Sequence, residues 1–313
     1  FMENFIISLE VVCPMFLMML VGFIIKKIKI VDDSTLKQTN NMVFRIFLPM
    51  LVFRNIYTSD LSVSFSPKLL LFALAAILAL FFLAFVVIVC IEKDNRRKGV
   101  LIQAIFRSNF VLFGIPVITS LYGEESAGVA SIIIAVAIPL YNVLAVVSLE
   151  IFRGGRIDVK KILKGIVTNP LIIGSALGIL ILLSGFEMPA MIDGTVDSLS
   201  KIATPLAFVI LGGTFDFSTL KSDIRPLLIG VLGRLVASPM IGLPISILLG
   251  FRGAELVVLM VMFGAPPAVS SFTMAQQMDA DSDLAGSIVI IASIASIFTV
   301  FLWTFLLKQT CYI

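Results

Sequence analysis

The sequence has no histidine, and only 14% of its 313 residues are charged, against roughly a quarter in a typical soluble domain. Without histidine, imidazole-based zinc sites, Ser-His-Asp hydrolysis and histidine-ligated haem are excluded. The three cysteines, Cys13, Cys90 and Cys311, are scattered and odd in number, which indicates neither a disulfide framework nor a metal site. We therefore expect no metal site and no cofactor.

Apolar residues make up 59% of the chain, and the formal net charge of +3 is too small to indicate a nucleic-acid partner. Disordered, collagenous, disulfide-rich and cytosolic proteins do not have this composition. A helical span takes about 20 apolar residues, so ten spans would use about 200 residues and leave about 110 for loops. The composition predicts an all-α polytopic membrane protein embedded in the lipid bilayer, with no room for a second, soluble domain.

Apolar runs predict ten transmembrane helices. We expect them at residues 5–25, 37–57, 67–90, 99–121, 127–152, 162–184, 194–216, 223–249, 254–278 and 284–307.

Lysine and arginine are distributed unevenly over the predicted loops. Loops after the odd-numbered helices hold fifteen of them, while the opposite side holds only Lys68, Arg252 and Lys308. Because cytoplasmic loops carry the excess of positive charge, the odd-helix loops are predicted to face the cytoplasm. Both termini of this protein of the cell (inner) membrane are then extracytoplasmic.

Prolines recur with matching spacing in the two halves of the chain. Pro14 and Pro49 are 35 residues apart, and so are Pro170 and Pro205. The tetrapeptide 113–116 (FGIP) also matches 263–266 (FGAP). Ordered pairs of this kind indicate an internal repeat.

The repeat unit contains five predicted helices, an odd number, so its second copy must enter the membrane in the opposite direction. We expect a 5+5 inverted repeat, with the first copy at residues 1–153 and the second at 154–313. Inverted repeats are a construction principle of secondary transporters.

Helices four and nine each contain a Gly-x-Pro sequence at mid-span, and Pro267 doubles the second break. Matching breaks in both repeats predict a midplane binding site, with half-helix N-termini just after Pro116 and Pro267 that suit a carboxylate. An ordinary proline kink is the alternative. The predicted site residues at the breaks are Gly114, Ile115, Pro116, Gly264, Ala265, Pro266 and Pro267.

Polar residues near the breaks are further candidates for contact with the substrate. Asn109 precedes Pro116, and Ser270 and Ser271 follow Pro267. Asn109 suits either a ligand contact or a link between helices, and the serines suit either a ligand contact or a bond to their own helix backbone.

Three arginines, Arg45, Arg107 and Arg234, are predicted to lie deep in the membrane, where a charge is costly and suggests a role. They are expected to attract anions or to pair with acidic residues or backbone carbonyls. Gln276 and Gln277 are candidate ligands of a coupling ion. Coupling to Na+, coupling to H+ and uncoupled transport all stay open.

Several segments resemble the auxin efflux carrier family. Residues 109–116 (NFVLFGIP) followed by 121–123 (LYG) are similar to its fourth helix. Residues 37–49 resemble its second helix, and 234–239 (RLVASP) resemble its eighth. The resemblance extends over essentially the whole chain.

The resemblance implies that broken helices four and nine cross and bind organic anions, as in plant auxin exporters and bacterial malonate carriers. It also implies a transport domain (helices 3–5 and 8–10) that moves like an elevator against a scaffold (helices 1, 2, 6 and 7). The loop at 153–165 is short, and residues 264–267 depart from the plant pattern. A small carboxylate of the bacterial type therefore fits better than auxin.

The leading hypothesis is a secondary transporter of small organic anions, and a homodimer through the scaffold helices is left open. The alternative is a membrane receptor that binds such an anion without moving it. A channel fits the repeat less well. We do not expect an enzyme, because the chain lacks histidine, a Gly-x-Ser-x-Gly elbow and a paired mid-membrane aspartate.

Overall fold

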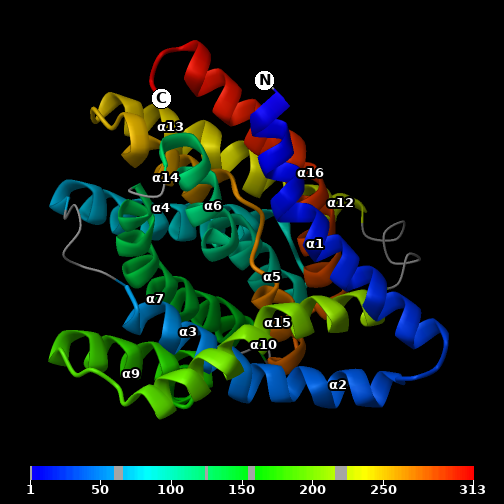
Figure 1. Cartoon of the computed structure of the whole chain (residues 1–313). Coiled ribbons are helices and arrows are strands. Elements are labelled where there is room, and N and C mark those ends of the chain that lie inside the picture. The colour runs from blue at the N-terminus through cyan, green and yellow to red at the C-terminus, as the bar shows by residue number, and fades with distance from the viewer. Residues whose placement is uncertain (1, 60–65, 124–125, 154–158, 216–223) are drawn as a thin grey trace.

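The computed structural model describes residues 2–59, 66–123, 126–153, 159–215 and 224–313. This part of the chain is built from helices and contains no strand (Figure 1). The first half contains α1 (Met2–Lys27), α2 (Asp33–Met42), the π-helical turn η1 (Val43–Phe47), α3 (Leu48–Tyr57), α4 (Pro67–Ile91), α5 (Asn95–Phe106), α6 (Phe110–Tyr122) and α7 (Ala127–Phe152).

The second half is also made of long helices, short helices and one π-helical turn. It contains α8 (Val159–Val167), α9 (Pro170–Ser184), α10 (Ala190–Thr214), α12 (Ile224–Leu232), the π-helical turn η3 (Gly233–Ala237), α13 (Ser238–Leu248), α14 (Gly253–Gly264), α15 (Ser270–Gln277) and α16 (Ser282–Gln309).

The all-helical class predicted from the sequence is confirmed in the described part of the chain. Five of its helices are long and apolar enough to cross a membrane, and α5 and α6 together form a sixth candidate. The five are Pro67–Ile91, Gly128–Phe152, Ala190–Thr214, Ile224–Leu248 and Ser282–Gln309. The number of ten spans stays a prediction.

Each π-helical turn ends two residues before a proline. The N–H of Leu48 bonds to the carbonyl of Val43, five residues back, and Pro49 follows it. In the same way, the N–H of Ser238 bonds to the carbonyl of Gly233, and Pro239 comes next. Because proline cannot donate a backbone hydrogen bond, the turn before it is free to widen. The apolar pattern of the sequence does not predict these turns.

Glycines let one set of helices approach closely. α1 packs on α10, and a Cβ added at Gly22 of α1 would lie 1.9 Å from the carbonyl oxygen of Val209. α3 packs on α9, and a Cβ added at Gly174 would lie 2.7 Å from the carbonyl oxygen of Pro49. Small residues favour such close helix packing in membranes. We call α1–α3 with α8–α10 the first helix group.

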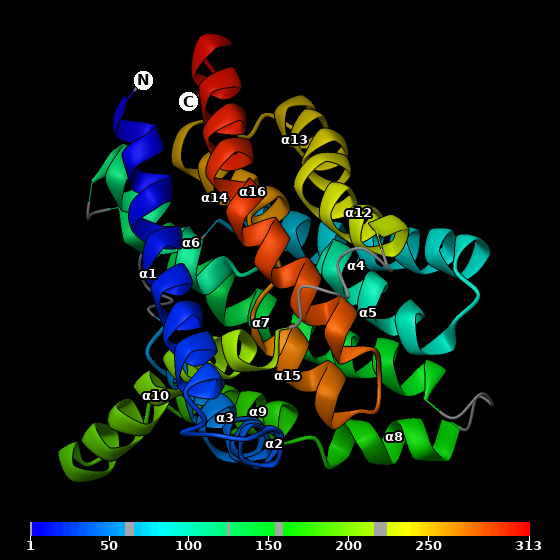
Figure 2. The ribbon, with the colours of Figure 1, turned by 90° about the vertical axis from the view of Figure 1, so that its right-hand side faces the viewer.

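The other helices, α4–α7 and α12–α16, form the second helix group. Within it, α5 packs on α4 and α7, α14 on α6 and α13, and α15 on α16. The two termini of the chain lie on the same side of the molecule (Figures 1 and 2). Several contacts, including those of α3 and α9 with α7, join the two groups.

Candidate functional site

Two interrupted helices meet in the middle of the molecule. α5 ends at Phe106 and α6 begins at Phe110, while α14 ends at Gly264 and α15 begins at Ser270. The backbone N–H of Asn109, in the first break, donates a 2.8 Å hydrogen bond to the carbonyl oxygen of Pro266, in the second. The two breaks are therefore in direct contact.

The first break does not lie where the sequence predicted it. Pro116 and Gly114 are inside α6, and the half-helix begins before them, after Asn109. The direction of the chain changes by 53° between Asn95–Gly114 and Pro116–Tyr122, as expected of a proline, but the helical hydrogen bonding is interrupted earlier. The side chain of Ile115 lies outside the part of the chain that the structure describes.

The second break lies where the proline pair predicted it. Gly264 is the last residue of α14, and Pro266 and Pro267 occupy the non-helical segment before Ser270. The matching tetrapeptides 113–116 and 263–266 therefore occupy different places, one inside a helix and one at a break. That pair does not mark equivalent positions.

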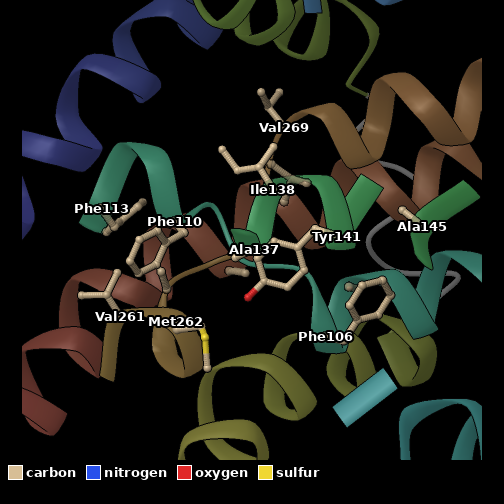
Figure 3. Close-up of a cluster of buried hydrophobic side chains, with 14 of the residues drawn as sticks. Phe106, Phe110, Phe113, Ala137, Ile138, Tyr141, Ala145, Val261, Met262 and Val269 are labelled. Carbon is tan, nitrogen blue, oxygen red and sulfur yellow. The ribbon is translucent and has the colours of Figure 1, made fainter. Parts of the chain in front are cut away.

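A cavity of about 70 Å³ lies beside the contact between the two breaks, well above the roughly 10–15 Å³ that one water molecule needs. Both helix groups contribute to its wall. It is lined by Leu48, Leu51, Val52, Asn55, Arg107, Ser108, Asn109, Phe110, Val111, Leu112, Ile138, Tyr141, Asn142, Leu171, Thr204, Ala268, Val269 and Ser270. Figure 3 shows Phe110, Ile138, Tyr141 and Val269 among these residues.

Arg107 occupies the first break and is 5% exposed. Its Nη2 donates to Asn142 Oδ1 at 2.8 Å and to Ser270 Oγ at 2.9 Å, and its Nη1 donates to the sulfur of Met274. These acceptors are neutral, and no carboxylate among the described residues forms an ion pair with Arg107. Its positive charge is thus not compensated by the surrounding side chains.

Two amide groups at the cavity have hydrogen-bonding capacity to spare. The Nδ2 atoms of Asn109 and Asn142 are buried and have no acceptor in the described part of the chain. Leaving a buried donor without a partner is costly. Both asparagines and Arg107 line the cavity, so three side chains with hydrogen-bond donors surround it.

Arg234, in the π-helical turn η3, is completely buried and does not line the cavity. It donates to carbonyl oxygens at the ends of both broken helices: Ile105 at 3.1 Å, Phe106 at 3.3 Å, Met262 at 2.6 Å and Ala265 at 2.6 Å. The last carbonyls of a helix lack partners and carry the negative end of its dipole. One guanidinium therefore caps α5 and α14 together.

The remaining predicted residues lie away from the cavity. Arg45 is exposed on the surface of the protein and does not line the cavity, and its depth in the membrane stays a prediction. The carbonyl oxygen of Ser271 accepts a 3.2 Å hydrogen bond from Gln103. The side chain of Gln276 accepts a 2.6 Å bond from Asn40 of α2, which links the two helix groups. Gln277 is partly buried and is not a cavity residue.

Asn142 and Tyr141 of α7 also line the cavity and were not among the predicted site residues. Asn142 is 1% exposed and binds Arg107. A signal for it was present, since it is an amide in the middle of an apolar helix, three residues after Pro139. Intramembrane polar residues of this kind mark functional positions.

Ionic contacts join helix ends on one side of the second helix group. Arg153, after α7, bonds to Asp279 at 2.7 Å, and Arg97 of α5 bonds to Asp281 at 3.1 Å. The hydrogen bond to Asp279 raises the pKa of Arg153. The helices that carry Arg107, Asn142 and Ser270 are thus linked at their ends as well as at the cavity.

Comparison with known proteins gives consistent results. Residues 7–304 match the family described as membrane transport protein. An uncharacterized transporter of Methanothermobacter thermautotrophicus is 26% identical over 303 residues, covering 96% of this chain and 98% of that protein. An uncharacterized transporter of Methanocaldococcus jannaschii is 26% identical over 312 residues, covering 96% and 99%. The family match confirms the resemblance seen in the sequence. The chain therefore belongs to the membrane transport protein family, whose members are integral membrane proteins similar to auxin efflux carriers.

Proposed function

We propose that this protein is a secondary transporter that moves small organic anions, carboxylates in particular, across the membrane by elevator-type alternating access. The observation that carries the proposal is the cavity at the crossing of the two breaks. Arg107, Asn109 and Asn142 line it, and the amide nitrogens of both asparagines have no acceptor in the described part of the chain. The described lining carries no acidic side chain. This chemistry attracts a carboxylate and repels a cation.

An inverted repeat underlies the proposed mechanism, and a pair of helix contacts supports it. Gly22 of α1 faces the carbonyl oxygen of Val209 in α10, and Gly178 of α9 faces the carbonyl oxygen of Phe53 in α3. A shift of 156 residues relates Gly22 to Gly178 and Phe53 to Val209, and the same shift relates the paired prolines. If each residue is replaced by its counterpart in the other half, the contact of Gly22 with Val209 becomes the contact of Gly178 with Phe53. This exchange is what a five-helix repeat with copies at 1–153 and 154–313 requires.

The first helix group corresponds to the proposed scaffold, and the second to the proposed moving domain. Close glycine contacts hold α1 to α10 and α3 to α9. Arg234 and the ion pairs of Arg97 and Arg153 hold the second group together. Because the cavity wall has residues from both groups, a displacement of one group against the other would open it to alternate sides of the membrane.

The proposed topology has the odd-helix loops in the cytoplasm and both termini outside. Contacts between loops agree with it: the Arg97–Asp281 and Arg153–Asp279 pairs join three loops that the proposal places on the cytoplasmic side. On the other side, Lys68 donates to the carbonyl of Leu249. A coupling ion near Gln276 and Gln277 and a homodimer through the scaffold stay part of the proposal.

Transport into proteoliposomes tests the proposed function. We expect the purified protein to catalyse counterflow of at least one acid from a panel of short carboxylic acids. Asn109→Ala is expected to reduce its rate at least about tenfold, because the variant lacks a donor to the anion. Asn95→Ala, at the far end of α5, is the matched control and should retain the rate. Binding without counterflow would indicate a receptor, and an unchanged rate in Asn109→Ala would contradict the assigned site.

A further inference from the structure

The cavity has a single positive charge in its wall. Of the residues that line it in the described part of the chain, only Arg107 carries a charged group. The other buried arginine near the crossing, Arg234, lies outside the lining and is bonded to four carbonyl oxygens. The wall can therefore neutralise one anionic group.

The free donors are also enough for one carboxylate. Arg107 has five N–H donors, of which three are used by Asn142, Ser270 and Met274. The Nδ2 atoms of Asn109 and Asn142 have no acceptor among the described residues. A carboxylate has two oxygens that each accept more than one hydrogen bond, so a single group can satisfy these donors.

The rest of the wall has apolar side chains and uncharged polar ones, among them Asn55, Tyr141 and Thr204, and no second charge in the described lining. Side chains of Leu51, Val52, Phe110, Ile138 and Val269 form much of it (Figure 3 shows the last three). An apolar carbon skeleton fits such a surface, whereas a second carboxylate would be buried against it without a counter-charge. Burying an unpaired charge is strongly unfavourable.

We infer that the preferred substrate is a small monocarboxylate with a short apolar body, and that the cavity discriminates against dicarboxylates of the same length. This inference rests on the proposed function and narrows its substrate class. Among carboxylates, the inference favours acids with one carboxylate group. Acids of the malonate type carry two negative charges, and the wall has a positive charge for only one of them.

Matched pairs of acids test the inference on the full chain. Propanoate is compared with propanedioate, and butanoate with butanedioate, as competitors of counterflow and as stabilisers in thermal unfolding at pH 7.5. We expect each monocarboxylate to be bound at least about tenfold more tightly than its dicarboxylate partner. Equal or tighter binding of the dicarboxylates would overturn the inference and leave the proposed function standing. If none of the four acids is bound or transported, both the inference and the proposed function are contradicted.

A second cation in the wall provides an independent test. Thr204→Lys places an amine on the cavity lining of α10, while Thr195→Lys places one on an exposed position of the same helix. We expect Thr204→Lys to reduce the preference for butanoate over butanedioate at least about tenfold. Thr195→Lys should leave it unchanged. If Thr204→Lys is folded and has no larger effect than Thr195→Lys, the single charge of the cavity does not set the preference.

Discussion

Arg107 and Arg234 are both buried near the crossing of the broken helices, and their surroundings differ. Arg234 is bonded to four backbone carbonyls at the C-terminal ends of α5 and α14, where two helix dipoles stabilise a positive charge. Arg107 is bonded to neutral side chains and borders a cavity lined by two asparagines whose amide nitrogens have no acceptor among the described residues.

The two surroundings indicate two different roles for a buried arginine: one stabilises the fold, and the other binds a ligand. A guanidinium that satisfies helix ends stabilises the fold, because without it those carbonyls would be buried and unpaired. A guanidinium held by neutral groups beside a cavity keeps its capacity to bind an anion. The predictions below compare these two roles.

The largest effect is expected from Arg234→Met, which leaves the four carbonyls without their donor. We expect the free energy of unfolding to fall by at least about 2 kcal/mol, since each unpaired buried group is costly. Thermal unfolding in detergent measures the loss. Arg234→Lys keeps the charge but has fewer donors, so its free energy of unfolding should lie between those of the wild type and Arg234→Met. A melting temperature of Arg234→Met equal to that of the wild type would show that Arg234 is not a structural cap.

An intermediate effect is expected from Asn142→Asp, which places a carboxylate next to Arg107 with almost no change in volume. The new ion pair neutralises the cavity, so we expect the affinity for carboxylates to fall about 10- to 100-fold with the protein still folded. Inhibition of counterflow by unlabelled acid measures the affinity. Asn95→Asp is the control, because it adds the same charge away from the cavity. Unchanged affinity in Asn142→Asp would mean that the anion does not bind at Arg107.

The smallest effect is expected from Asn40→Ala. It removes the hydrogen bond to Gln276 that links the two helix groups away from the cavity. We expect a change in transport rate of less than about fivefold and no change in affinity, because one hydrogen bond contributes about 1 kcal/mol. Initial rates at several substrate concentrations separate the two quantities. If Asn40→Ala lowered the affinity as much as Asn142→Asp, residues away from the cavity would affect anion binding as strongly as residues that line it.

Much of the fold could be predicted from the sequence. Apolar runs placed most helix ends within about four residues, since the bilayer thickness sets how many apolar residues a span needs, but the run at 162–184 is divided into α8 and α9. The second break was also predictable, because Pro266 and Pro267 cannot donate backbone hydrogen bonds.

The first break could not be predicted, because its cause is tertiary. The chain leaves the helix at Phe106, where Arg234 binds the last carbonyls of α5 and Pro266 accepts the N–H of Asn109. Neither partner is close in sequence. The local signal at Gly114 and Pro116 pointed to a bend one to two turns further on.

Whether each arginine is buried inside the protein could not be predicted either. Arg45 and Arg234 both lie in π-helical turns that precede a proline, yet one is exposed and the other completely buried. Which way each turn faces depends on how its helix packs. Arg107 was a candidate from its position, but its partner Asn142 appears only when α7 is placed beside the first break.

The most direct test of the account is the stabilisation of the protein by a short carboxylate, measured for the wild type and Arg107→Gln. We predict that butanoate raises the melting temperature of the wild type in a saturable manner and does not raise that of a folded Arg107→Gln protein. An equal, saturable increase in both proteins would contradict the assignment of Arg107 and its cavity as the anion site.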